Sequence, residues 1–238
     1  MRQMRRSLFR YHVWLGWLVG VPLLLWTVSG LVMVVRPIET VRGSDLRIEQ
    51  EAAPLSAGLS SVAAFVAAGK PALREVRIVM REGRAVARIT YANDDQALFD
   101  AASGARLTPI GEDEARRIVR AQVRPAAARD AIAGATLFAA KDAPFDFRKP
   151  MPVWQVRLAD GTHVYVGRDT AEIEAVRTRY WRFYDFMWGL HIMDLQTRED
   201  THHPILIVFT AIAALATVLA VLLMIARYAP RRRSRPSE

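Results

Sequence analysis

The sequence contains no cysteine, and this absence limits the chemistry available to the whole chain. Without thiols the protein cannot form disulfides, thiolate metal sites, iron–sulfur clusters or a cysteine nucleophile. Covalent attachment of a c-type haem is excluded for the same reason. The sequence also lacks a phosphate-binding glycine loop and a nucleophile elbow. We therefore predict no catalytic residue and favour a protein that is not an enzyme.

Charged residues are missing from two long runs, at positions 13–35 and 204–226. As a helix, each run is long enough to cross a hydrocarbon core of about 30 Å. Lipid offers no hydrogen bonds to a bare backbone, so a helix is the expected conformation. We predict two transmembrane helices. A cleaved signal peptide is the alternative for the first run, but its apolar residues continue past Ser29 and Gly30, the small residues near its end.

The two tails, 1–12 and 227–238, carry +4 each of the net charge of +9. The residues between the tails carry 24 basic and 23 acidic side chains, which almost cancel. Basic residues beside a membrane helix mark its cytoplasmic end. We therefore predict a bacterial inner-membrane protein with both termini in the cytoplasm and a periplasmic middle region. The basic tails contact the lipid bilayer, and nucleic acid is not an expected partner.

Hydrophobic periodicity divides the middle region into a linker at 36–54 and two repeats. Each repeat begins with an amphipathic helix, followed by short alternating strands between turn residues. In the first repeat (55–110) the helix spans 56–68 and the strands span 76–81, 86–91 and 97–100. In the second repeat (111–176) the helix spans 111–123 and the strands span 135–140, 153–158 and 163–167. We therefore predict an α+β fold in which two transmembrane helices flank a periplasmic domain of two helix and antiparallel-sheet repeats.

Three sequence blocks follow one another in a recognisable order. They are Arg10–Gly16 (RYHVWLG) with Pro22–Gly30 (PLLLWTVSG), then Phe99–Leu107 (FDAASGARL), then Trp188–Asp194 (WGLHIMD) followed by His203–Leu206 (HPIL). Together they resemble the PepSY domain in its membrane-anchored form, with PepSY-associated transmembrane helices. The middle block matches the family's strand ending, Asp-x-x-Thr/Ser-Gly. Both repeats are therefore expected to be PepSY-like.

The second repeat departs from this ending, because Gly167 replaces the aspartate and Ala171 replaces the final glycine. A binding role for that turn is in doubt. The resemblance itself implies a binding or regulatory domain. Some relatives inhibit peptidases, and others are attached to iron-uptake or redox systems.

An aromatic segment at 177–203 is expected to form an interfacial helix and a turn before the second transmembrane helix. Trp181, Tyr184, Trp188 and His191 share one helical face. Trp and Tyr favour the membrane interface, so the helix is expected to lie at the outer leaflet or against the membrane helices. Packing in an ordinary protein core is the alternative.

Histidines are the candidate cofactor ligands, because an imidazole beside flat rings suits a haem b. His191 leads this set, with His202 or His203 as a partner on the same side of the membrane. His12 is expected near the opposite face, roughly 30 Å away, and so cannot share an iron with His191 in one chain. His163 is interpreted as an ordinary strand residue. Acidic residues near His202, including Asp194, are read as a solvated loop, so no metal site is predicted.

Three functions remain open. The leading one is an anchored interaction or accessory module, serving iron uptake or envelope redox systems, whose partner is another membrane or periplasmic protein or a second copy of the chain. The second is a b-type haem electron carrier or a component of a ferric-siderophore reductase. Relatives with four membrane helices resemble haem-bearing reductases, and this chain has half that number. The third is a peptidase-inhibiting module.

Overall fold

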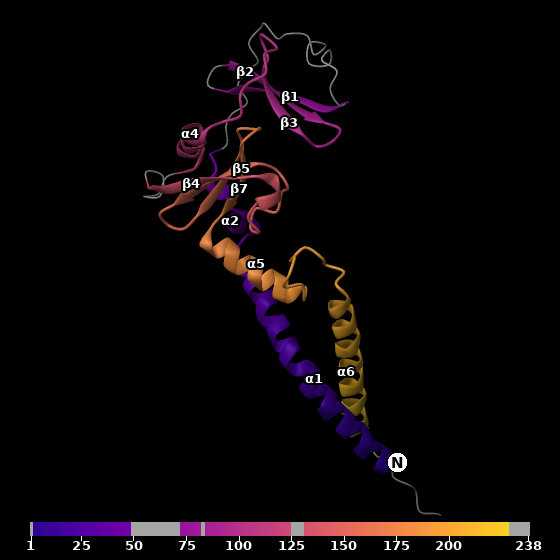
Figure 1. Cartoon of the computed structure of the whole chain (residues 1–238). Helices are drawn as coiled ribbons and strands as arrows, with labels where there is room; N and C mark the ends of the chain where they lie inside the picture. The colour runs from indigo at the N-terminus through magenta and orange to yellow at the C-terminus, as the bar shows by residue number, and fades with distance from the viewer. Residues whose placement is uncertain (1, 49–71, 82–83, 125–130, 229–238) are drawn as a thin grey trace, which may run out of the picture. The chain divides into compact units, whose positions relative to one another are not determined.

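The computed structural model describes residues 2–48, 72–81, 84–124 and 131–228 (Figure 1). The chain forms two compact units, which we call the helical unit (1–36 and 183–238) and the sheet unit (37–182). The predicted helix at 56–68 lies outside the described residues. The fold is α+β, with two long apolar helices at the ends of the chain and two antiparallel sheets between them in sequence.

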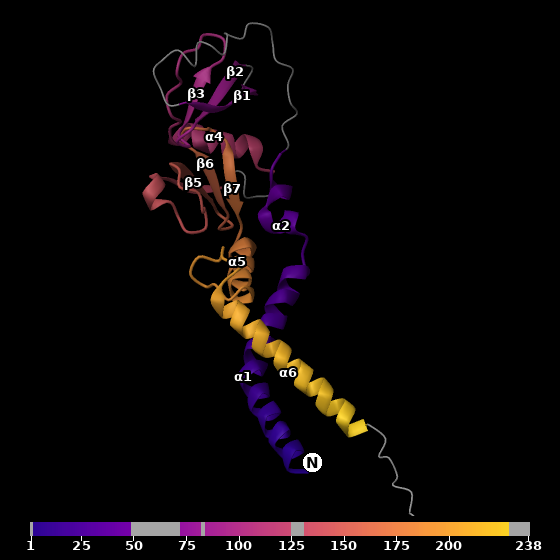
Figure 2. The same ribbon diagram turned by 90° about the vertical axis from the view of Figure 1, so that its right-hand side faces the viewer.

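The helical unit contains α1 (Arg2–Val34) and α6 (Pro204–Tyr228), which contact one another (Figure 2). Both are long and apolar enough to cross a membrane, over Phe9–Val34 and Pro204–Tyr228. Threonine hydroxyls in these helices donate to carbonyls four residues earlier, so their polar groups are satisfied within the helix. The two predicted apolar helices are therefore present, and α1 begins earlier than residue 13 because its arginine-rich first turns are also helical.

The segments predicted as repeats, 55–110 and 111–176, keep the names first and second repeat below, and the first contains a three-stranded antiparallel sheet in the order β1-β2-β3. Its register pairs Arg77 with Arg88 and Val86 with Asp100. One face buries a cluster that includes Ile89 and Phe99, and the opposite face carries residues such as Val86. This alternation is what the sequence predicted. The strands are β1 (Leu73–Arg81), β2 (Arg84–Tyr91) and β3 (Gln96–Asp100).

The second repeat adds α4 (Glu112–Gln122) to a four-stranded antiparallel sheet in the order β4-β5-β6-β7. Acidic residues fill the first turn of α4, which complements the helix dipole. Its apolar face inserts Ile118 and Val119 into a core with Val156 and Val164. The strands are β4 (Ile132–Phe138), β5 (Val153–Leu158), β6 (His163–Gly167) and β7 (Ile173–Arg177). The helix and the β5–β6 hairpin were predicted, whereas β7 was not.

Short elements complete the fold. The segment expected as a linker contains α2 (Ile38–Arg42) and the 3-10 helix η1 (Ser44–Leu46). Beyond η1 it packs against the second repeat, because Arg47 donates to the carbonyl of Ile173. A second 3-10 helix, η2 (Ala140–Asp142), follows β4, and α5 (Arg179–His191) forms where the aromatic helix was predicted.

The turns that follow β3 and β6 have the same backbone hydrogen bonds. In the first, the amide of Gly104 donates to the carbonyl of Asp100 at 2.8 Å. In the second, the amide of Ala171 donates to the carbonyl of Gly167, also at 2.8 Å. Gly104 and Ala171 both take the left-handed conformation, with φ of 71° and 54°. The two repeats are therefore alike in this turn despite their different residues.

Candidate functional site

A cleft of about 680 Å³ lies in the sheet unit, and both repeats supply its walls. The first repeat contributes the end of β1 and the outer residues of β2 and β3. The second repeat contributes the turn between β6 and β7. The segment from α2 to Ile48 also lines the cleft. Its floor is apolar, with Val86, Leu98 and Ile173 buried there. The cleft therefore exists only because the two repeats pack together.

Ion pairs connect the repeats around this cleft. Arg88 of β2 pairs with Glu172 of the β6–β7 turn, and Arg81 of β1 pairs with Glu114 of α4. Two further arginines, Arg47 and Arg124, line the same cleft. Acidic residues, Glu39, Asp45 and Glu172, line the cleft as well, so apolar residues and charges of both signs are available to a ligand.

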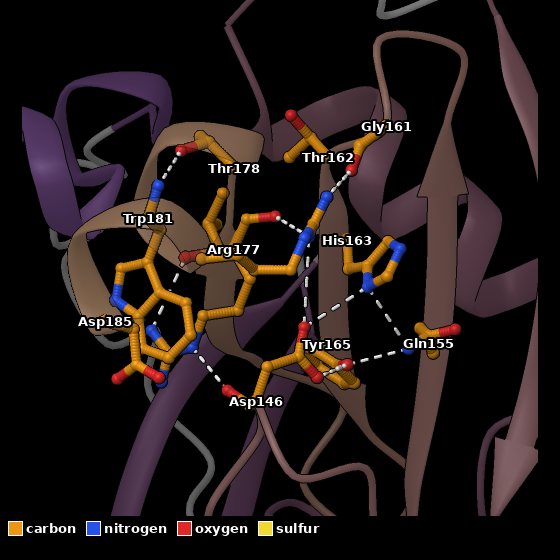
Figure 3. A network of polar contacts seen from close by, with 12 residues as sticks. Asp146, Gln155, Gly161, Thr162, His163, Tyr165, Arg177, Thr178, Trp181 and Asp185 are labelled. Carbon is orange, nitrogen blue, oxygen red and sulfur yellow. Dashed lines mark hydrogen bonds and ion pairs between the residues drawn. The ribbon is translucent and has the colours of Figure 1, made fainter. Parts of the chain in front are cut away.

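A polar network lies at the other end of the second sheet, and sequence reasoning missed it (Figure 3). The hydroxyl of Tyr165 donates to Asp146 Oδ1 at 2.5 Å and accepts from Gln155 Nε2 at 2.7 Å. His163 Nδ1 lies 3.3 Å from Asp146 Oδ2. Tyr165 and Gln155 are buried. The network fixes the loop that carries Asp146 against strands β5 and β6.

Two arginines extend this network to the start of α5 (Figure 3). Arg177 Nε donates to the carbonyl of Asp146 at 2.7 Å, and its guanidinium lies 4.2 Å from the ring centre of Trp181. Arg182 donates to the carbonyl of Gly161 at 2.6 Å. Trp181 therefore packs within the sheet unit, against Arg177. The residues of the predicted aromatic face are thus shared between the sheet unit and the helical unit.

Electrostatics give this network a structural role. Burial alone would raise the pKa of Asp146, but hydrogen bonds from His163 and Tyr165 lower it below its ordinary value. Burial and the Asp146 hydrogen bond raise the pKa of Tyr165 well above its ordinary value. At neutral pH Asp146 is thus an ionised acceptor and Tyr165 a neutral donor. These hydrogen bonds connect the loop that carries Asp146 to strands β5 and β6. His163 lies on β6, as expected of a strand residue.

His191 has the most defined surroundings of the predicted ligands. Its ring stacks on Trp26 of α1, with ring centres 4.6 Å apart and planes 14° apart. Its Nδ1 lies 3.1 Å from both Ser29 Oγ and the carbonyl oxygen of Trp26. A side chain at Gly30 would bring its Cβ to 3.1 Å from His191 Cε1, so glycine leaves room for the ring.

These contacts assign the tautomer of His191. The hydroxyl of Ser29 donates to the carbonyl of Trp26 at 2.8 Å, so its oxygen is left to accept. Both neighbours of Nδ1 are then acceptors, and Nδ1 must carry the proton. The lone pair is left on Nε2, which makes no hydrogen bond with the described residues. A ligating histidine has this arrangement, with its other nitrogen bonded to a carbonyl. His191 therefore fits a single axial ligand.

The other candidate histidines lie elsewhere. His12 is fourteen residues before Trp26 on α1, about 21 Å along the helix. His203 precedes Pro204, which lines an apolar groove with Leu18 and Val19, about 11 Å along α1 from Trp26. Its Nδ1 and that of His12 are buried and, in the described part of the chain, have no hydrogen-bond partner. A haem shared by His191 and His203 stays a prediction.

The loop between α5 and α6 uses its acidic residues internally. Asp194 accepts hydrogen bonds from the amides of residues 196, 197, 199 and 200 and from the hydroxyl of Thr197. These bonds, chiefly from Thr197, hold the pKa of Asp194 far below its ordinary value. His202 is exposed, and its amide donates to Asp200 Oδ1 at 2.8 Å. Across the described residues no group of three His, Asp or Glu could hold a metal ion.

Comparisons with known proteins do not extend these observations. No family model, no curated protein and no solved structure matches this chain.

Proposed function

We propose that this protein is a membrane-anchored binding module, whose sheet unit faces the periplasm and engages another membrane or periplasmic protein. The two long apolar helices and the basic tails support the anchoring. The matching turns after β3 and β6 support two related units within the sheet unit.

The cleft between the repeats carries this proposal. It has the volume of a ligand site, buried apolar residues in its lining, and charged residues of both signs, of which four are arginines. By contrast, the polar groups of Asp146 and Tyr165 form hydrogen bonds within their own network. The cleft is therefore the surface that we propose for recognition.

Site-specific photocrosslinking in cells tests the cleft. A benzoylphenylalanine at Met80, which lines the cleft, is expected to give a discrete product of higher mass. The same residue at Leu137, exposed on β4 and outside the cleft lining, is the matched control. Adding Arg88→Glu should weaken the Met80 product, because it reverses one charge at the rim. Equal products from both positions, or internal crosslinks alone, would reject the binding cleft. A peptidase in the product would favour the peptidase-inhibiting function.

Thiol labelling tests the orientation, and the absence of cysteine makes every introduced thiol unique. An impermeant maleimide should label Ala121→Cys, exposed on α4, in intact cells. Ser7→Cys, in the arginine-rich start of α1, should react only after lysis. Labelling of Ser7→Cys in intact cells would contradict the proposed topology.

A second candidate function is a b-type haem carrier, and the fixed tautomer of His191 favours it. A bound haem would supply one-electron transfer, and His191 Nε2 would be its ligand on this chain. The visible spectrum of the detergent-purified protein, oxidised and reduced, is the test. A Soret band that disappears in His191→Ala and persists in His12→Ala would establish a haem at His191. If the protein shows no such band, the haem-carrier function is rejected and the binding module is the one proposal that stays.

A further inference from the structure

The contact of α5 with α1 fixes the depth of the aromatic helix in a bilayer. Trp26, Ser29 and Gly30, which hold the ring of His191, lie four to eight residues before Val34, the end of the first apolar span. At 1.5 Å per residue this places His191 about 6–12 Å inside the span. The end of α5 is therefore held at the level of lipid.

Two phenylalanines on α5 are exposed near this level. Phe183 and Phe186, three residues apart and so on one face, are 45% and 44% exposed. Phe186 is five residues from His191, a distance of at most about 7.5 Å along the helix. Phe183 is at most about 12 Å away. Whatever the tilt of α5, Phe186 lies within the span or at its boundary.

Three charged residues near this level, Asp185, Asp194 and Arg198, are neutralised within the helical unit, whereas Glu199 and Asp200, farther along the loop, are exposed. Asp185, whose side chain is 5% exposed, pairs with Arg198 at 2.7 Å. The guanidinium of Arg198 also lies 5.7 Å from the ring centre of Phe186. Asp194 is saturated by amides of its own loop. An element at the membrane boundary needs its charges paired in this way, because unpaired charges are costly there.

We propose that the second half of α5 and the start of the loop that follows it are embedded in the outer leaflet, where Phe186 and Leu195 contact lipid. Leu195 is 51% exposed and belongs to this loop. The occupant of this apolar surface is the bilayer itself, because the contact with α1 sets its depth and Asp185 beside it is paired with Arg198. This inference rests on the proposed membrane anchoring.

Nitroxide labels on single cysteines test the inference in the full chain reconstituted into phospholipid vesicles. Oxygen partitions into lipid and a nickel chelate stays in water, so the ratio of their collisions with the label reports its surroundings. Phe186→Cys and Leu195→Cys are the test positions. Leu24→Cys, exposed on α1 inside the span, is the lipid control, and Ala121→Cys on α4 is the water control. Circular dichroism checks that each variant is folded, and Phe183→Cys replaces any variant that is not.

We expect oxygen-to-nickel ratios at positions 186 and 195 near that of Leu24→Cys and severalfold above that of Ala121→Cys. A ratio like that of Ala121→Cys at both test positions would overturn the inference while leaving the anchoring intact. Protection from both reagents would also overturn it, because protein, such as a second copy of the chain, would then cover the face. A water-like ratio at Leu24→Cys would instead reject the membrane anchoring.

Discussion

The turns after β3 and β6 share a backbone and differ in how side chains support it. In the first turn Asp100 Oδ1 accepts from the amide of Ser103 at 2.7 Å and from its hydroxyl at 2.8 Å. In the second turn Gly167 has no side chain, and Thr170 Oγ1 donates forward to Glu174 at 2.9 Å. The first turn is supported from its beginning and the second from the strand that follows.

This difference coincides with the position of the cleft. Residues 170–173 of the second turn form part of its wall, and Glu172 pairs there with Arg88 of the first repeat. The second turn also keeps alanine, instead of glycine, in the left-handed conformation, which costs an L-residue about 1–2 kcal/mol. The aspartate that supports the first turn is thus absent from the second turn, which lies where the two repeats meet.

Exchanging the motif should have the largest effect. In Gly167→Asp the new Cβ would overlap Thr170 Oγ1 and crowd Met151, so the turn must shift. We expect a loss of about 2–3 kcal/mol in the free energy of unfolding, as for overpacked sites. Denaturant unfolding in detergent measures it, and Gly167→Asp with Thr170→Ala should recover part of the loss. An unchanged midpoint in Gly167→Asp would show that the two turns are interchangeable.

The left-handed positions should respond in opposite directions. Ala171→Gly relieves strain but adds freedom to the unfolded chain, so we expect a gain of about 0.5–1 kcal/mol. Gly104→Ala should lose about 1 kcal/mol for the converse reason. Thermal unfolding of the two variants side by side gives both signs. The comparison fails if both substitutions shift the melting temperature the same way.

The ion pair between the repeats should contribute less. Glu172 is partly exposed, so solvent screens its attraction to Arg88. A double-mutant cycle with Arg88→Ala and Glu172→Gln is expected to give a coupling below about 1 kcal/mol. A coupling of several kcal/mol would mean that this pair, and not the apolar floor, holds the repeats together.

The smallest effect concerns the charge of Asp100. Hydrogen bonds from the amide and hydroxyl of Ser103 hold the pKa of Asp100 below its ordinary value of 3.8. The charged form therefore stabilises the fold above that pH, and this contribution is lost as the pH falls through the lowered pKa. Asp100→Asn should be slightly less stable than the parent at pH 7, with the gap closing below about pH 4. Melting temperatures from pH 3 to pH 7 measure the gap, and a pH-independent gap would exclude the charge as its source.

Local patterns predicted much of the fold. The two long apolar helices were predicted from uncharged runs. The helix α4 and the β5–β6 hairpin were predicted from hydrophobic periodicity and turn residues that lie close together in the sequence. Strand β7 was missed because its five residues, Ile173–Arg177, include two charged side chains and follow a turn without the usual glycine. Its pairing with β6 is set by tertiary packing.

Sites built from distant residues were harder to predict. Asp146 lies in a proline-rich loop, and nothing in its spacing points to Tyr165 or Arg177. His191 was singled out by its aromatic neighbours, yet its actual partners, Trp26 and Ser29, are more than 160 residues away in sequence. Residue type selected His191 as a candidate ligand, and only the fold showed which groups surround its ring.

The close approach of His191 to Gly30 has an evolutionary consequence. Any side chain at position 30 would begin 3.1 Å from the imidazole, so the ring would have to shift by a few tenths of an ångström from its stacked position on Trp26. In descendants of this chain, we expect a larger residue at position 30 to accompany a change at position 191. Coordinated change at these two positions would trace the pairing of α5 with α1 through sequences too divergent to align by overall identity.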